Sequence, residues 1–262
     1  NLMTSAIARM NMFLHGIEDF KIARGDTLKS PAFLEKDKLK TFNIVLANPP
    51  YSIKQWNRKE FEKDPYGRNI YGTPPQGTAD YAFQQHIMKS LDENNGRCAI
   101  LWPHGILFRD AEAEMRKKMV ESDVVEAVIG LGPNLFYNSP MESMVFVCNT
   151  NKQKSRKKKI LFINAVDEIA EEKGRARLTD QHIKKIFDAY KKFEDINGFS
   201  KVITMNDVLK KNGNMNISFY VKRTDVGALK QVEVERLIVE WGKKSNNLRV
   251  SMGRLFAEYS KG

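Results

Sequence analysis

The stretch FNIVLANPPY at residues 42–51 decides the fold. Residues 42–47 form a nearly continuous apolar run of strand length, which is typical of a parallel strand buried on both faces. Two prolines end this strand, because proline lacks the backbone donor that strand pairing needs. Since open α/β sheets bind ligands at the carboxyl ends of their strands, we expect Asn48 and Tyr51 to lie at a ligand site.

Helices and apolar strands alternate on both sides of this stretch. Before it, we expect a helix that Thr4 caps and that ends near Gly16, and a short strand at 20–24. After it, the spacing of apolar residues predicts helices at about 79–93 and from about 110, and strands at 98–102, 124–131, 143–150 and 159–165. The last two strands flank a polar segment and predict an antiparallel hairpin. This alternation predicts a three-layer α/β sandwich.

The charge is distributed unevenly along the 262 residues. The formal net charge is +11, yet residues 1–150 hold 18 basic and 18 acidic side chains, and the rest of the chain holds 25 and 14. Amphipathic helices are expected at 179–193 and 225–243. We therefore predict an α/β domain at 1–165 and a mainly helical, basic region at 166–262 that faces a polyanion such as nucleic acid. A solvated basic tail is the alternative.

Composition excludes several classes of protein. No run of 18 apolar residues occurs, and the first twenty residues lack the pattern of a signal peptide. The sequence favours a cytoplasmic globular protein with no membrane partner. Cys98 and Cys148 lie in predicted strands, where buried reduced thiols are expected. The four histidines show no metal-site spacing, so we predict no metal. Because a helix follows Asn1 so closely, we expect a piece of a longer protein.

The residue types at 48–51 suit a reaction at an aromatic amine. Such an amine is a poor nucleophile, because its lone pair is delocalised into the ring. The Asn48 side-chain oxygen and the Pro49 carbonyl can each accept a hydrogen from the amino group, which returns the lone pair to nitrogen. The fixed φ of Pro49 keeps its carbonyl pointed at the site, and Tyr51 offers a ring on which a planar base can stack. The alternative is a diproline turn with Tyr51 as packing.

Three further features indicate a pocket for a flipped base beside a nucleic-acid channel. Asp26 follows the predicted strand at 20–24 and could accept from an adenine amino group, although an Asx turn is the alternative. Phe136 and Tyr137 follow another strand and could supply an opposite stacking ring or pack in the core. The long segment after Tyr51 mixes aromatic side chains with basic ones that include Lys54, Arg58 and Lys59.

A second basic cluster lies in NKQKSRKKK at 151–159, between two predicted strands. It reads as a solvated hairpin tip, and contact of Lys157 and Lys158 with phosphates is the functional alternative.

More specific motifs run from residue 4 to about 165. They are TSAIARMNMFLHGI at 4–17, RGDTL at 24–28, TADYAFQQHIMKSL at 78–91, GRCAILWPHGILFR at 96–109 and VIGLGPNLFYNSPMESMVFVCN at 128–149. With NPPY at 48–51, this succession resembles the modification subunit of bacterial type I restriction-modification systems, a DNA methyltransferase that uses S-adenosylmethionine. NPPY by itself is shared with enzymes that methylate RNA bases or protein glutamine.

By this resemblance, the fold is a Rossmann-like S-adenosylmethionine-dependent methyltransferase sheet with a mainly helical, basic C-terminal region. Tyr51 and Phe136 would stack on the target adenine, with Tyr137 as the alternative to Phe136. Asp26 would contact the adenine of the methyl donor, and Asn48 would also border the donor. The catalytic motif that holds the target base would comprise Asn48, Pro49, Pro50 and Tyr51.

One feature departs from that family. Its glycine-rich loop for the methionine portion of the cofactor is absent, because the G-x-G stretch of this sequence, GLGPN at 130–134, lies where the family has its base-stacking segment. The resemblance therefore implies a catalytic domain at 1–165 whose N-terminal portion is incomplete, and a region at 166–262 for subunit or DNA contact. We expect this portion alone to be inactive, and the intact subunit to methylate adenine in DNA together with a specificity subunit and a restriction subunit. The alternatives are an inactive assembly or nucleic-acid-binding module and an RNA amino-methyltransferase.

Overall fold

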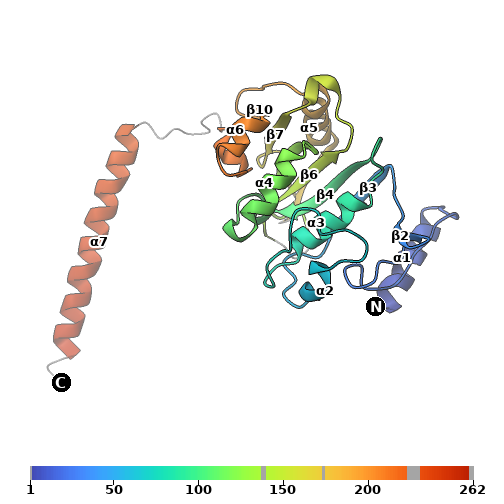
Figure 1. The fold of residues 1–262 in the computed structure, drawn as a ribbon. Coiled ribbons are helices and arrows are strands. Elements are labelled where there is room, and N and C mark those ends of the chain that lie inside the picture. The colour runs from blue at the N-terminus through green and yellow to red at the C-terminus, as the bar shows by residue number, and fades with distance from the viewer. Residues whose placement is uncertain (1, 137–139, 173–174, 223–230, 260–262) are drawn as a thin grey trace. The chain divides into compact units, whose positions relative to one another are not determined.

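The computed structural model describes residues 2–136, 140–172, 175–222 and 231–259. Its centre is a six-stranded sheet with the strand order β10-β7-β5-β6-β4-β3 (Figure 1). The pairs β3–β4 and β5–β7 are parallel, and the other neighbouring pairs are antiparallel. The strands are β3 (Ile44–Ala47), β4 (Arg97–Pro103), β5 (Val125–Leu131), β6 (Ser143–Asn149), β7 (Lys159–Ala165) and β10 (Ser200–Thr204).

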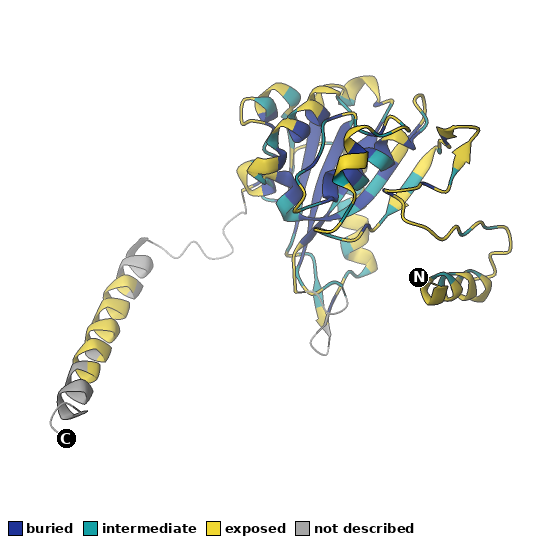
Figure 2. Ribbon diagram, turned by 60° about the horizontal axis from the view of Figure 1, so that its bottom comes forward, coloured by how far each residue is buried: buried dark blue, intermediate teal, exposed yellow. Residues whose placement is uncertain are grey.

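Helices cover both faces of this sheet, which confirms the predicted three-layer α/β sandwich (Figure 2). Successive residues of a strand point to opposite faces. Val128 of β5 accordingly joins a core with α3, α4 and α6, whereas its neighbour Ile129 joins a second core with α5. These helices are α3 (Asp80–Lys89), α4 (Ala113–Glu121), α5 (Asp180–Lys192) and α6 (Met205–Leu209).

The strand that precedes the two prolines is parallel, as predicted, but it is not buried. β3 lies at the edge of the sheet, and among the described residues only β4 pairs with it. Val45 packs on the core beneath α3, but the alternate side chains of Ile44 and Leu46 are 64% and 77% exposed. The prediction failed because an apolar run cannot distinguish a central strand from an edge strand.

The predicted hairpin of the last two strands is wrong. β6 and β7 do not pair, because β5 lies between them and pairs with both. All seven residues of β5 are buried, so this strand requires a partner on each edge. Proximity in sequence favoured the hairpin, whereas burial of β5 decides the strand order.

The first forty residues differ from the prediction in two details. Helix α1 (Leu2–Leu14) includes Thr4 within it, so Thr4 is not its cap, and no residue of α1 is buried. Residues 20–24 form no strand and pair with none of the strands in the described part of the chain. A short hairpin of β1 (Leu34–Glu35) and β2 (Lys38–Leu39) forms further along instead.

The long segment at 52–77 is more ordered than its sequence suggested. It contains the short helix α2 (Arg58–Glu62), and its two ends are joined by side chains. The Gln76 amide donates to the Lys54 and Trp56 carbonyls at 3.0 and 3.1 Å, and the Trp56 indole donates back to the Gln76 carbonyl at 3.2 Å. The segment is therefore a closed loop.

The compact unit extends to Lys222, past the boundary at 165 that we predicted. The reason is that β10 adds to the sheet along β7, while α5 and α6 pack on its two faces. The described residues of this region are mainly helical, and they also include short strands. The strands after residue 165 are β8 (Ala170–Glu172), β9 (Arg175–Arg177) and β10.

Both predicted helices of this region are present. Thr179 caps α5, since its side chain accepts a hydrogen bond from the His182 amide. The second unit, described by itself, is helix α7 (Gln231–Tyr259), which runs well beyond the predicted end at 243. The first residues of that prediction, 225–230, lie outside the described residues.

Cys98 and Cys148 are free and buried, and they face each other across β4 and β6, which confirms the predicted thiols. No helix in the described ranges is long and apolar enough to cross a membrane. The same residues include no group of three or more His, Cys, Asp or Glu that could hold a metal ion.

Candidate active site

A pocket lies where β3 ends and β6 begins. Its volume is about 460 Å³, which suits a planar small molecule or a single nucleobase. The structure thus brings the loop at 48–51 together with Phe136, as the sequence predicted. The lining consists of Asn48, Pro49, Pro50, Tyr51, Phe136, Met141, Glu142 and Ser143.

The polar groups of the loop are available to a ligand. Asn48 is exposed and Pro49 is buried, and no residue in the described part of the chain makes a hydrogen bond to the Asn48 side chain or the Pro49 carbonyl. Asn48 and Pro49 are adjacent in the chain and both line the pocket, so it offers one side-chain acceptor and one backbone acceptor. A group with two hydrogens on one atom, such as an amine, matches this pair.

Tyr51 is supported from behind by a second aromatic residue. Its ring lies 6.3 Å from the ring of Trp102, centroid to centroid, at an angle of 43°. Trp102 is fully buried, and its indole donates to the Gln84 side chain at 2.9 Å. Burial, and then the charge of Asp80, raise the pKa of Tyr51, so its phenol stays neutral at physiological pH. Tyr51 is suited to stacking and not to proton transfer.

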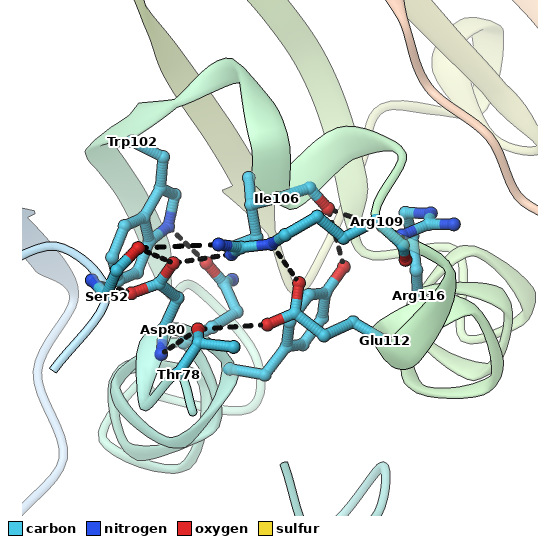
Figure 3. Close-up of polar contacts among 10 residues, drawn as sticks. Ser52, Thr78, Asp80, Trp102, Ile106, Arg109, Glu112 and Arg116 are labelled. Atoms are coloured by element: carbon cyan, nitrogen blue, oxygen red, sulfur yellow. Dashed lines mark hydrogen bonds and ion pairs between the residues drawn. The ribbon is translucent and has the colours of Figure 1, made fainter. Parts of the chain in front are cut away.

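Behind the loop lies a charged cluster that the sequence did not point to (Figure 3). The buried carboxylates Asp80 and Glu112 share the guanidinium of Arg109, at 2.5 and 2.9 Å. Asp80 also accepts from the Ser52 amide at 2.6 Å. Burial favours loss of the Arg109 proton, but Asp80 and Glu112 outweigh this effect and raise the pKa of Arg109. Arg109 therefore stays charged between its two carboxylates.

One sequence feature could have revealed this cluster. Asp80 stands between Ala79 and Tyr81, which are both fully buried apolar residues in the first turn of α3. A carboxylate flanked in this way on the inner face of a helix requires a partner, because an unpaired buried charge is costly.

Asp26 lies apart from this pocket. Its Oδ1 accepts from the amides of Leu28 and Lys29, at 3.0 and 3.1 Å, which is the Asx turn that we gave as the alternative. Asp26 does not line the pocket of Asn48. Its segment is held by Arg68, whose guanidinium donates to the Thr27 and Leu28 carbonyls at 2.8 and 2.7 Å. The second carboxylate oxygen of Asp26 is outside the turn.

The basic residues fall into two separate places. Lys54 and Lys59 are exposed on the closed loop after Tyr51, and Arg58 donates through Nε to the Pro74 carbonyl at 2.8 Å. Lys157 and Lys158 are exposed at the opposite end of the sheet. β6 runs from Ser143 at the pocket to Asn149 near these lysines, a length of about 20 Å at the usual rise per residue.

Part of that second cluster is structural. Lys152 is only 4% exposed, and its ammonium group donates to Asp123 at 2.6 Å and to the Val125 and Lys159 carbonyls at 3.0 and 2.7 Å. The run at 152–159 is therefore not a uniformly solvated tip. Phe136 is described and lines the pocket, whereas Tyr137 lies outside the described residues.

Comparison with known proteins gives consistent matches. The family model described as N-6 DNA Methylase matches residues 1–228. The methylase subunit of the type I restriction enzyme MjaVII from Methanocaldococcus jannaschii is 35% identical over 249 residues, which are 89% of this chain and 42% of that subunit. The HindI methylase subunit from Haemophilus influenzae is 32% identical over 219 residues, 79% of this chain and 47% of that subunit.

A solved structure matches as well. The type I restriction-modification methyltransferase subunit from Streptococcus thermophilus superposes with a TM-score of 0.78 at 35% identity, covering 85% of this chain and 47% of that one. The fold is the α/β Rossmann-like methyltransferase fold. This chain spans less than half the length of these relatives. Because the family model covers most of its residues, the chain belongs to the N-6 DNA methylase family.

Proposed function

We propose that this chain is part of a modification subunit that transfers a methyl group from S-adenosylmethionine to the exocyclic amino group of adenine in DNA. One observation carries the proposal. Asn48 and the Pro49 carbonyl offer two free acceptors in a pocket that also contains the rings of Tyr51 and Phe136. Family membership and the similarity to type I methylase subunits support it.

The two acceptors activate the amine without a strong base. Each accepts one hydrogen of the amino group, which favours a pyramidal nitrogen with a localised lone pair. As nitrogen attacks the methyl carbon, the carbon–sulfur bond of the donor would break and its electron pair would stay on the departing thioether. Positive charge develops on the nitrogen, and both hydrogen bonds strengthen. The amino proton then becomes acidic and is released to solvent. Tyr51 keeps its proton, because its pKa is raised by burial and by Asp80, so it does not act as the base.

The rings hold the base after it leaves the duplex. A base inside the double helix cannot present its amino group to this pocket, so it must be flipped out. Stacking on an aromatic ring contributes about 1–3 kcal/mol per base. Tyr51 and Phe136 lie in the same pocket and supply such rings.

The methyl donor supplies an electrophilic methyl group on a sulfonium. Its fit to these residues rests on Asp26, because one carboxylate oxygen lies outside the Asx turn and can accept from an adenine amino group. Asn48, at the end of β3, would border the donor. The sequence contains no glycine-rich loop for the methionine portion, so we propose that donor binding requires residues beyond this chain.

DNA and the other subunits would bind at different places. Lys54 and Lys59 come soon after Tyr51 in the sequence and are exposed, so they suit contact with phosphates. Arg58 lies next to Lys59 in the sequence and donates to the Pro74 carbonyl. Helix α7 carries exposed Ile238, Trp241, Leu248 and Met252 at spacings that return to one helix face. This stripe suits a helical partner, and we propose the specificity subunit for it, with the restriction subunit joining the same cytoplasmic assembly.

The test uses the full-length subunit assembled with its specificity subunit on DNA that contains the target site. Asn48→Ala should lower the single-turnover rate of adenine methylation by on the order of a hundredfold, with donor affinity nearly unchanged. Tyr51→Phe should keep much of the activity, whereas Tyr51→Ala and Phe136→Ala should capture the flipped base poorly. A fully active Asn48→Ala enzyme would refute the assignment.

The same assay distinguishes the alternative functions. An assembly that binds DNA but methylates nothing would favour a binding module, and methylation of RNA alone would favour an RNA enzyme.

A further inference from the structure

We propose that Asp80 is a positioning residue that holds the loop at 48–51 in its working conformation through Ser52. The inference rests on the proposed function of this loop and adds a residue to it. Asp80 does not line the pocket, so it would act through the backbone that follows Tyr51 and not through contact with the base.

The conformation of Ser52 requires such support. Its φ is +52°, in the left-handed region that residues other than glycine rarely adopt. Backbone of this kind persists only where the surroundings hold it, and it is frequent next to functional groups. Since Ser52 follows Tyr51 directly, its conformation sets the direction in which the chain leaves the tyrosine.

Two hydrogen bonds fasten the backbone of Ser52 and Ile53 to the start of α3. The Ser52 amide donates to Asp80 Oδ1 at 2.6 Å, and the Ala79 amide donates to the Ile53 carbonyl at 3.1 Å. The second link is between backbone atoms and does not depend on side-chain identity. The first depends entirely on the carboxylate of Asp80.

The carboxylate is itself held in place. Asp80 is fully buried, and its Oδ2 pairs with Arg109 at 2.5 Å. Arg109 also donates to Glu112 at 2.9 Å, and Glu112 accepts from the Thr78 hydroxyl at 3.2 Å (Figure 3). Oδ1 receives the Ser52 amide, while Oδ2 is fixed by the guanidinium and also accepts from the Ser52 hydroxyl in a longer contact of 3.4 Å.

The same helix supports the ring of Tyr51. Gln84 lies one turn after Asp80 on α3 and accepts from the indole of Trp102, against which Tyr51 leans. Helix α3 therefore fixes Tyr51 twice, through its ring and through the backbone after it. Removing the Asp80 link should leave the ring contact intact but free the backbone.

The test compares Asp80→Asn with the exposed control Asp110→Asn in the full-length subunit assembled with its specificity subunit. The aspartate accepts from Ser52 at one oxygen and from Arg109 at the other, whereas an asparagine has an NH2 group in place of one oxygen. Because that group donates and does not accept, the asparagine cannot keep both bonds in the same geometry. Asp80→Asn should lower the single-turnover methylation rate roughly tenfold or more, with the affinities for DNA and donor changed less than about twofold. Asp110→Asn should match the wild type.

A rescue separates positioning from loss of fold. Glycine adopts a positive φ without strain, so Ser52→Gly should restore part of the rate in the Asp80→Asn background. A double variant as slow as Asp80→Asn alone, or an Asp80→Asn rate equal to the wild type, would overturn the proposal. So would parallel losses of rate and of DNA and donor affinity, which indicate general damage.

A measurement independent of catalysis distinguishes this proposal from the proposed function. Hydrogen exchange of the peptide covering 48–56 should be faster in Asp80→Asn than in the wild type, and unchanged in Asp110→Asn. If the wild-type assembly does not methylate adenine, the proposed function fails and the exchange rates still decide whether Asp80 holds the loop. If the wild type is active and exchange is unchanged, the positioning role alone fails.

Discussion

The two ends of the central sheet both contain buried pairs of opposite charge, but the pairs leave different groups free. At the end where β3 stops, Arg109 pairs with both Asp80 and Glu112 behind the loop, and the polar groups of Asn48 and Pro49 remain available. At the other end, Lys152 is itself part of the packing, bonded to Asp123 and to two carbonyls. A run of basic residues in the sequence therefore does not show which of their charged groups are free to bind a ligand.

Breaking the buried pair at the lysine-rich end should have the largest effect on stability. Lys152→Met keeps the volume but removes the partner of Asp123 and the donor to the Val125 and Lys159 carbonyls. We expect a loss of about 3 kcal/mol in the free energy of unfolding, measured by urea titration. Lys157→Met, at an exposed position in the same run, should change it by less than about 0.5 kcal/mol. If Lys152→Met changed the free energy of unfolding as little as Lys157→Met does, the structural role of Lys152 would be refuted.

The two ends of helix α3 also differ in how an arginine affects a neighbouring titratable side chain. At its start, Arg109 attracts the carboxylate of Asp80, whereas near its end Arg68 lies 3.4 Å from the Nδ1 of His86. Burial, and then the positive charge of Arg68, lower the pKa of His86 to about 4. The folded protein therefore binds fewer protons at His86 than the unfolded chain does between pH 4 and pH 6.5.

Stability should consequently fall as the pH falls below about 6.5. Between pH 6.5 and pH 5 we expect His86 to contribute a loss on the order of 2 kcal/mol, because the unfolded chain gains a proton that the folded protein does not. His86→Gln should flatten this part of the pH profile of the unfolding free energy. The exposed control His15→Gln should leave it unchanged, and an unaltered profile in His86→Gln would contradict the assignment.

The smallest expected difference concerns the exposed basic residues of the two ends. Each phosphate contact contributes about 0.9 to the slope of log affinity against log salt for duplex DNA. Replacing Lys54, Arg58 and Lys59 by Gln should reduce this slope by about 2, whereas replacing Lys157 and Lys158 should reduce it by less than about 1. The measurement is DNA binding by the assembled subunit over a salt series, and a larger reduction from the second pair would reverse the comparison.

Local sequence patterns predicted the layers of the fold but not the strand order. The alternation of helices and strands, the cap at Thr179 and the two buried thiols follow from rules that act over a few residues. The edge position of β3 and the insertion of β5 between β6 and β7 depend on which strands compete for partners across the whole sheet. An apolar run contains no information about that competition.

The candidate site was predictable to a similar extent. Asn48, Tyr51 and Phe136 meet in one pocket because each follows or precedes a strand at the same end of the sheet. Arg109 and Glu112 could not be assigned from the sequence, because charged residues at the start of a helix are ordinarily solvated and only the tertiary pairing of Arg109 with Asp80 gives these two a role. Asp26, predicted for the donor, was placed by a strand that does not form.

We propose that the target base enters the pocket at the end of β3. The most direct measurement is photocrosslinking, with a photoactivatable pyrimidine such as 5-iodouracil in place of the target adenine, in the full-length subunit assembled with its specificity subunit. Crosslinks to Tyr51 or Phe136 are expected, together with their loss when the modified base stands outside the target site. Crosslinks confined to the lysine-rich segment at 152–159 would show that the base does not enter this pocket.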